Sequence, residues 1–232
     1  MQIGPGIHAV KQREGIWVHA FLLDDGQDVT LIDTLYGEDA GHILAELGAM
    51  GRSPRDIARI LLTHGHRAHL GGLAALKAAS GAPVYSHPWE ADIVAGERKQ
   101  QCMSLVPQKP FIVWPFQVAS RFGKHKPVPV DRLLGDGERV GPVRVVYAPG
   151  HTPGHIAFHW PERRALFAGD ALVTWPTLEP GWTGFTLNLK QNMDTVRNLA
   201  TLDLDIVGGG HGDPITANGT AKLREAIATR GG

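Results

Sequence analysis

The sequence predicts an α/β protein. Short runs of apolar and β-branched residues alternate with segments whose apolar residues recur at helical spacing, which is the pattern of strands and helices in succession. In addition, a histidine or aspartate follows several apolar runs closely, at His64, His151, Asp170 and His211. Ligands of α/β proteins bind at the carboxyl ends of the strands, so this placement favours the same fold class.

The first half of the chain predicts strands and helices in alternation. Residues 24–26, with the sequence Asp-Asp-Gly, separate two apolar runs and indicate a β-hairpin. The sequence Ser-Pro-Arg-Asp at 53–56 is typical of a helix start, because proline suits the first helical position. Gly51 and Gly81 each end a segment of helical spacing. The predicted strands cover residues 16–23, 29–33, 60–63 and 83–86, and the predicted helices about 38–50 and 73–80.

The second half repeats this arrangement, and its apolar runs lead to candidate ligands. Each ligand is expected on the loop that leaves a strand, where glycines let the backbone approach closely. A helix around Leu223 and Ile227 closes the chain. The runs and the ligands that follow them are 143–148 before His151, 164–168 before Asp170 and 204–207 before His211.

The composition indicates a globular protein without a nucleic-acid or membrane partner. The chain has 232 residues, of which 43% are hydrophobic, and this suits one large globular domain or two small ones. Its 23 basic and 23 acidic residues give no net charge, which argues against binding to nucleic acid or to a membrane surface. No secretion signal is evident, so a cytoplasmic location is expected. The single cysteine, Cys102, excludes an internal disulfide and a thiolate metal cage.

Three histidines at positions 64, 66 and 69 have the spacing of metal ligands. On an extended segment His64 and His66 project to the same side, and His69 follows about one helical turn later. Buried imidazoles each need a partner for their ring nitrogens, and a shared divalent cation supplies one to all three. The alternative is a solvated, histidine-rich turn without metal. The three later ligand candidates favour the metal site over that alternative.

Two long segments, 97–130 and 172–190, interrupt the regular pattern and carry aromatic side chains. Loops of this length in a compact domain are usually functional, as substrate or lid loops. Their aromatic residues predict either the wall of a substrate pocket or a contact in a homo-oligomer, and the sequence favours neither. The candidate pocket residues are Trp114, Phe116, Trp175 and Trp182.

These motifs resemble the metallo-β-lactamase superfamily of metallohydrolases. The resemblance covers nearly the whole chain and implies a single domain over residues 1–232. It implies a four-layer αβ/βα sandwich, in which two mixed sheets face each other and helices cover the outer faces. The motifs are His64-Gly-His66-Arg-Ala-His69 with Leu-Gly-Gly after it, Pro-Gly-His151-Thr-Pro-Gly-His155, Phe-Ala-Gly-Asp170 and Gly-Gly-His211-Gly-Asp. The implied ligands are His64, His66 and His151 for a first metal, His69 and His211 for a second, and Asp170 as a bridge.

The chain departs from the family at Ala68, where the family pattern His-x-His-x-Asp-His has an aspartate. In the family that aspartate binds the second metal and often protonates the leaving group, and a methyl group does neither. Losing its charge leaves more positive charge uncompensated, which is costly at low effective dielectric. We therefore expect one firmly bound zinc, or another divalent metal, and a second metal that is weak or absent. Two origins stay open for Ala68: a laboratory substitution, or the natural residue of a divergent member.

The resemblance implies a hydrolase in which a zinc-bound hydroxide attacks a small acyl substrate, namely a carboxylic ester, lactone or thioester. Without the motif aspartate, substrates with good leaving groups should suffer least. Glutathione thioesters are disfavoured, because the segment after His211 is shorter than the helical extension of those hydrolases. Hydrolysis of β-lactams is a further alternative. A different alternative, supported by Ala68 alone, is a degenerate or engineered-inactive member that binds a ligand without turnover.

Two residues are candidates for hydrogen-bond partners behind the metal ligands. Asp33 ends an apolar run, where its carboxylate either accepts from a ligand histidine or caps a loop. His155 is expected to brace a loop as a donor rather than to bind metal. Asp213 is expected to form a turn after His211.

Overall fold

The computed structural model describes residues 1–14, 16–101, 111, 114–115, 118 and 124–229. None of the helices in these ranges has the length and apolar character needed to span a bilayer.

The strands are β1 (Gln2–Gly4), β2 (Ile7–Glu14), β3 (Ile16–Asp24), β4 (Val29–Ile32), β5 (Ile57–Leu61), β6 (Val84–Ser86), β7 (Arg132–Leu133), β8 (Arg139–Val140), β9 (Val143–Tyr147), β10 (Ile156–Trp160), β11 (Ala165–Val173) and β12 (Ile206–His211). The helices are α1 (Gly41–Ala49), α2 (Arg67–Leu70), α3 (Leu73–Ser80), α4 (Pro88–Val94), α6 (Leu189–Leu199) and α7 (Gly219–Ala228).

The strands of both chain halves join in one curled, mixed sheet, which has 12 strands within the described ranges. Its order is β7-β6-β5-β4-β3-β12-β11-β10-β9-β8, with β2 beside β3 and β1 beside β2. β4 to β7 pair in parallel, whereas β9, β10 and β11 pair antiparallel. The two halves meet where Val18 of β3 pairs with His211 of β12. This junction places a predicted metal ligand at the seam of the sheet.

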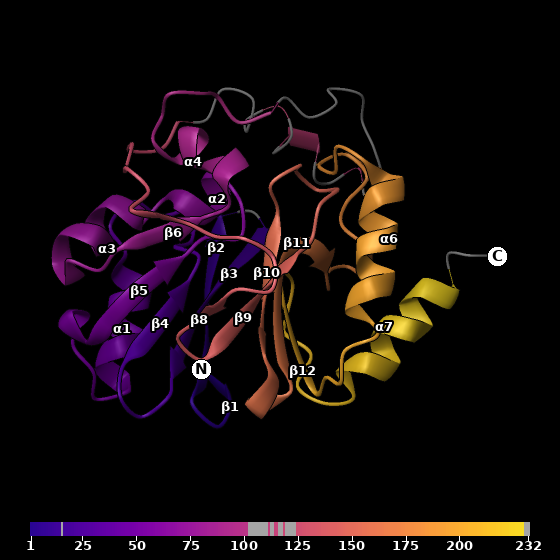
Figure 1. Cartoon of the computed structure of the whole chain (residues 1–232), viewed down its shortest axis with the longest axis horizontal. Coiled ribbons are helices and arrows are strands. Elements are labelled where there is room, and N and C mark those ends of the chain that lie inside the picture. The colour runs from indigo at the N-terminus through magenta and orange to yellow at the C-terminus, as the bar shows by residue number, and fades with distance from the viewer. Residues whose placement is uncertain (15, 102–110, 112–113, 116–117, 119–123, 230–232) are drawn as a thin grey trace.

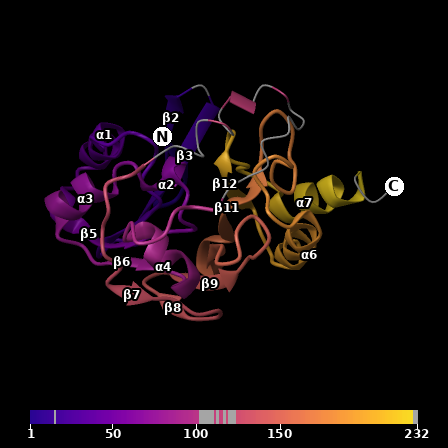
Figure 2. The same ribbon diagram turned by 90° about the horizontal axis from the view of Figure 1, so that it is seen from above.

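The two halves of the sheet face each other, and helices cover both outer faces (Figures 1 and 2). The central layer contains side chains from both halves, such as Phe21 and Phe167, whose ring centroids lie 4.9 Å apart. Leu47 of α1 packs in a second cluster on one outer face, and Leu223 of α7 packs in a third on the other. The predicted αβ/βα layering is confirmed. Hydrogen bonds between β3 and β12 join the two expected sheets into one.

The predicted N-terminal elements form, with shifts at their ends. β3 and β4 make the expected antiparallel hairpin around residues 24–26. The Ser-Pro-Arg-Asp signal forms only a single 3-10 turn over Pro54–Asp56, because β5 begins at the next residue. Ser53 and Asp56 cap that turn reciprocally. α3 ends at Gly81 in the left-handed conformation, as the glycine predicts.

Asp170 and His211 lie within strands, not on the loops after them, so that part of the prediction is wrong. β11 continues through Asp170 to Val173, and β12 includes the three glycines and His211. The register between β11 and β12 shifts on both sides of Gly169, whose φ is 49°. Glycine suggests a strand end by propensity, but here a bulge lets the pairing continue.

The sequence pattern did not predict α6. Its buried face consists of Asn192, Thr195, Val196 and Leu199, so polar residues interrupt the apolar period that signals a helix. Asn192 compensates for its burial by donating hydrogen bonds to two backbone carbonyls. Asn188 caps the helix start, since its side chain accepts from the third backbone N–H beyond it.

Candidate functional site

The structure brings the six predicted metal ligands together around one point. They form two overlapping groups, and within each group the candidate ligand atoms all lie within 4.8 Å of one another. All six residues are buried. The groups are His64, His66, His151 and Asp170, and His69, Asp170 and His211.

Local structure explains how the first three ligands converge. β5 ends at Leu61, three residues before His64, and the backbone of His66 is extended. The His64 and His66 rings lie together, with centroids 4.6 Å apart. His66 is also the N-cap of α2, which places His69 within the first turn of that helix. The predicted switch from extended chain to helix inside the motif is confirmed.

Asp33 and Thr63 fix which nitrogen of two ligands faces inward. The Asp33 carboxylate accepts the backbone N–H and the hydroxyl of Thr63, at 2.9 and 2.8 Å. Because that hydroxyl donates to Asp33, its lone pair accepts from His64 Nδ1 at 3.0 Å. His69 Nδ1 donates to Asp33 directly, also at 3.0 Å. Both rings therefore carry hydrogen on Nδ1 and present a lone pair on Nε2.

A backbone carbonyl orients His211 in the same way. His211 Nδ1 lies 2.8 Å from the Trp17 carbonyl oxygen, which only accepts, so this nitrogen also carries hydrogen. The Nε2 atoms of His69, His211 and His64 lie 3.3, 3.3 and 3.8 Å from carboxylate oxygens of Asp170. Lone pairs that face a carboxylate repel it, so each contact requires a proton or a cation between the two atoms.

Unsatisfied polar atoms show that a divalent metal fits this cluster. Five buried side-chain atoms of its six residues have no hydrogen-bond partner within the described part of the chain. Leaving one such atom unpaired costs about 1–3 kcal/mol, so a cation that satisfies several of them at once is strongly favoured. Imidazoles with a carboxylate are the donor set that zinc and similar divalent ions prefer. The five atoms are Nε2 of His64, His66 and His69, Nδ1 of His151 and Oδ1 of Asp170.

Without a cation, the imidazoles hold protons unequally. Burial opposes protonation of His69, but the Asp170 and Asp33 carboxylates outweigh it and raise the pKa of His69 to about 10. Burial lowers the pKa of His66 to about 4 and, together with neighbouring histidines, that of His64 well below its usual value. Metal binding therefore displaces a proton from His69, whereas His64 and His66 already have the neutral form that binds metal.

Two glycines make room for the Asp170 region. A Cβ on Gly210 would overlap Asp170 Oδ1 and lie 2.9 Å from His69 Cε1. A Cβ on Gly169 would lie 2.7 Å from both His155 Nε2 and Thr63 Oγ1, and the φ of 49° adds strain for any other residue. The glycines before Asp170 and His211 are thus required by the close approach of backbone to the cluster.

His155 supports Asp170, and it does so as an acceptor. Its Nε2 accepts the backbone N–H of Asp170 at 3.1 Å. The predicted role as a donor is wrong at this nitrogen, because β11 passes the ring and presents an N–H to it. Burial lowers the pKa of His155 to about 3, which keeps the Nε2 lone pair available.

The candidate pocket residues differ in their relation to the cluster. Trp182 is buried and stacks on the His211 ring, with centroids 4.7 Å apart. Its Nε1 donates to the Trp175 carbonyl at 3.0 Å, and the two indole rings are nearly perpendicular. Trp114 is 40% exposed, and Phe116 lies outside the described residues. A role of these side chains in substrate binding stays a prediction.

Three residues near the cluster were not singled out from the sequence. Thr63 directly precedes His64, and a hydroxyl residue next to a candidate ligand could have been recognised as a hydrogen-bond partner of its ring. Trp17 contributes only its carbonyl, which no residue type reveals. Glu90 is completely buried in the short helix α4. It lies between Trp89 and Ala91 in the sequence, and a charged residue between apolar neighbours could have been recognised as a buried polar contact.

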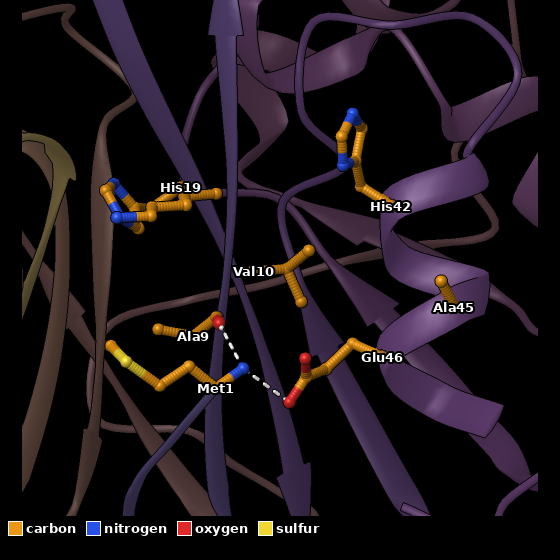
Figure 3. Close-up of a pocket in the computed structure, with 8 residues that line it drawn as sticks. Met1, Ala9, Val10, His19, His42, Ala45 and Glu46 are labelled. Atoms are coloured by element: carbon orange, nitrogen blue, oxygen red, sulfur yellow. Dashed lines mark hydrogen bonds and ion pairs between the residues drawn. The ribbon is translucent and has the colours of Figure 1, made fainter. Parts of the chain in front are cut away.

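A separate cavity of about 340 Å³ is lined by residues of β2, β3 and α1 (Figure 3). The N-terminal amine donates to the Ala9 carbonyl there at 3.1 Å and pairs with Glu46. His19 is buried in the wall, and burial lowers its pKa to about 4. The cavity is not part of the metal cluster, because none of the six candidate ligands lines it.

Comparison with known proteins agrees with this geometry. The profile of the metallo-beta-lactamase superfamily matches residues 18–211, which is most of the chain. The chain belongs to the metallo-beta-lactamase superfamily. It is similar to the probable metallo-hydrolase YybB of Bacillus subtilis, with 27% identity over 203 residues, 87% of this chain and 83% of that protein.

Other members of the superfamily are similar to this chain in sequence and in structure. A hydroxyacylglutathione hydrolase of Cereibacter sphaeroides is 32% identical over 161 residues, which is 67% of this chain but only 48% of that enzyme. A metallo-beta-lactamase family protein from Thermus thermophilus matches with a TM-score of 0.71 and 27% identity, over 99% of this chain and 81% of that protein. The chain is a metallo-hydrolase of this superfamily, and its histidine and aspartate cluster implies use of a divalent metal.

We expect the metal-free metallo-hydrolase to lose stability steeply as pH falls from about 6.5 toward 4. The pKa values of His66 and His19 are lowered to about 4, and that of His155 to about 3. Below pH 6.5 the unfolded chain therefore binds protons that the fold excludes, and the free energy of unfolding decreases. His69, with its raised pKa, is protonated in the fold over this whole range and in the unfolded chain except near pH 6.5, so it opposes the loss only at the top of the range.

Chelator-treated protein followed by circular dichroism over this pH range tests the expectation. Zinc-loaded protein is the comparison, and its transition should lie at lower pH because metal binds the neutral imidazoles. A stability that is unchanged between pH 7 and 5 in the metal-free protein would show that these histidines are not held neutral.

Proposed function

We propose that the protein hydrolyses carboxylic esters, lactones or thioesters of small acyl compounds, with zinc as the metal that it binds most firmly. The observation that carries the proposal is the convergence of imidazole lone pairs on Asp170, together with the buried ligand atoms that have no hydrogen-bond partner and that a cation would satisfy. The firmly bound zinc is assigned to His64, His66, His151 and Asp170, and a weaker second ion to His69, His211 and the shared Asp170.

The residues of the chain orient the metal ligands but supply no acid to protonate the leaving group. Bound zinc lowers the pKa of a water molecule to near 7 and polarises a carbonyl oxygen, so it supplies a nucleophile and a Lewis acid. Asp33 and Thr63 hold the ligand rings in the tautomer that binds metal. Ala68 stands where the family has its proton donor, so the leaving group departs without a positioned acid.

Similarity to a hydroxyacylglutathione hydrolase supports an acyl substrate, and thioesters in particular. A thiolate leaves readily without protonation, which suits a site with Ala68. The chain spans about half the length of that enzyme, so the glutathione part of its substrate is not carried over. The aromatic segment 172–190 is proposed as a wall of the acyl pocket, with Trp182 beside His211 as the described contact.

A leaving-group series tests the proposal. Zinc-loaded protein is assayed with one acyl group joined to thiols, phenols and alkanols of increasing pKa, and with a lactone and a β-lactam. We expect kcat/KM to fall by about 10²–10⁴-fold from thioesters to alkyl esters, since no acid assists the poor leaving groups. No turnover of any compound, with tight binding of the same compounds, would favour the alternative of a ligand-binding member.

A further inference from the structure

Glu90 is a buried carboxylate that the proposed chemistry does not use. It lies in α4 and has no exposed surface. Burial raises the pKa of Glu90 to about 7, although the hydrogen bonds that it accepts act in the opposite direction. A buried carboxylate is unfavourable unless its oxygens are bonded, so its partners show what it holds.

The two oxygens of Glu90 bind the two loops that carry the first-metal histidines. Oε2 accepts the backbone N–H of Gly65 at 2.9 Å, and Gly65 lies between His64 and His66. Oε1 accepts the hydroxyl of Thr152 at 2.5 Å, and Thr152 follows His151. One side chain therefore bridges segments that are 62 and 25 residues away from it along the sequence.

The glycines in both loops leave space for this carboxylate. A Cβ on Gly65 would lie 2.9 Å from Glu90 Oε2, and a Cβ on Gly154 would lie 2.9 Å from Glu90 Oε1. Both distances are shorter than ordinary contacts, so a larger residue at either position displaces the carboxylate or its loop. The middle residue of the His-Gly-His motif, Gly65, therefore has to lack a side chain for the Glu90 carboxylate to reach its backbone.

Further contacts hold α4 against the loop that carries His151. His87 caps α4 by accepting the Trp89 backbone N–H at 3.1 Å, and its ring stacks on Tyr147 with centroids 5.3 Å apart. The Tyr147 hydroxyl donates to the Pro153 carbonyl at 2.7 Å. Glu90 therefore projects from a helix that is fixed relative to the His151 loop, which gives its carboxylate a defined position.

We infer that Glu90 is a positioning residue that fastens the His64–His66 loop to the His151 loop and thereby sets the affinity for the first metal. The inference rests on the proposed metal site. Three ligands come from two loops, and their nitrogens bind one ion tightly only when both loops keep a common geometry. Residues behind metal ligands typically change metal affinity by about 10–100-fold when removed.

Zinc affinity of Glu90→Ala, Glu90→Gln and Thr152→Val variants tests the inference. Competition with a chromophoric chelator should show an affinity loss of about 10–100-fold for Glu90→Ala. A smaller loss is expected for Glu90→Gln, because its amide still accepts from Gly65 and can donate to the Thr152 hydroxyl. Asp131→Asn is the control, since Asp131 also accepts a backbone N–H, from Val84 at 2.7 Å, and should leave the affinity unchanged.

The absorption spectrum of the cobalt-substituted protein separates positioning from stability. We expect the Glu90→Ala and Thr152→Val variants to change the ligand-field bands, and Asp131→Asn to leave them unchanged. If the wild type binds zinc and both variants match it in affinity and spectrum, the role of Glu90 is refuted while the metal site stands. If the wild type binds no zinc, the proposed function itself fails. Should Glu90→Ala not fold, Thr152→Val and Glu90→Gln decide.

Discussion

Replacing Ala68 by aspartate is expected to raise turnover of esters with poor leaving groups by about 10²–10⁴-fold and to add a second tightly bound metal. Ala68 lies in α2 between the ligands His66 and His69. An aspartate there adds a negative charge to the group of His69, Asp170 and His211, which has one carboxylate. It also supplies an acid for the leaving group, so the slope of rate against leaving-group pKa should become shallower.

Metal analysis and the leaving-group series measure both effects. Ala68→Asn is the matched control, because it adds similar volume without the charge or the acid. Equal metal content and rates in the two variants would show that Ala68 is not what limits the site. A second bound metal without any gain in turnover would favour the alternative that the protein binds a ligand without hydrolysing it.

The Asp170→Asn variant should lose metal from both groups, and with it all hydrolysis above background. Asp170 belongs to both groups and is the carboxylate that three imidazole Nε2 atoms face. Asparagine keeps the shape of the side chain but removes the charge that attracts the cation. It also removes the charge that raises the pKa of His69 more than the Asp33 carboxylate does. The loss of affinity should exceed the about 10–100-fold typical of residues behind the ligands.

Equilibrium dialysis against zinc, followed by metal analysis, measures this loss. Asp213→Asn is a suitable control, because Asp213 lies two residues after His211 but its carboxylate is exposed and pairs only loosely with Lys11, at 3.8 Å. Retention of stoichiometric zinc by Asp170→Asn would mean that the histidines alone hold the metal, and the assignment of Asp170 as the shared ligand would be wrong.

The sequence predicted the fold class and six candidate ligands that the structure brings together, because both predictions depend on side-chain identity. Imidazoles and carboxylates that follow apolar runs are rare enough to be informative, and the structure gathers them into two groups. The strand positions of Asp170 and His211 were missed, because glycine propensity suggests a strand end where pairing with a neighbouring strand continues.

Several contacts made by backbone atoms or by buried polar residues had no signal in the sequence. The Trp17 carbonyl fixes the tautomer of His211 across 194 residues, and a carbonyl has no sequence signature. α6 buries Asn192 and Thr195, so its apolar period is broken. The role of His155 as an acceptor depends on how β11 passes its ring. Each of these features arises from tertiary packing rather than local pattern.

Crystals of the protein equilibrated with zinc at neutral pH, with diffraction data collected on both sides of the zinc absorption edge, test the central claim most directly. We predict a strong anomalous peak among His64, His66, His151 and Asp170, and a weaker peak or none beside His69 and His211. A map with no anomalous peak in the cluster, and with its imidazoles turned away from Asp170, would contradict the claim that these residues form a metal site.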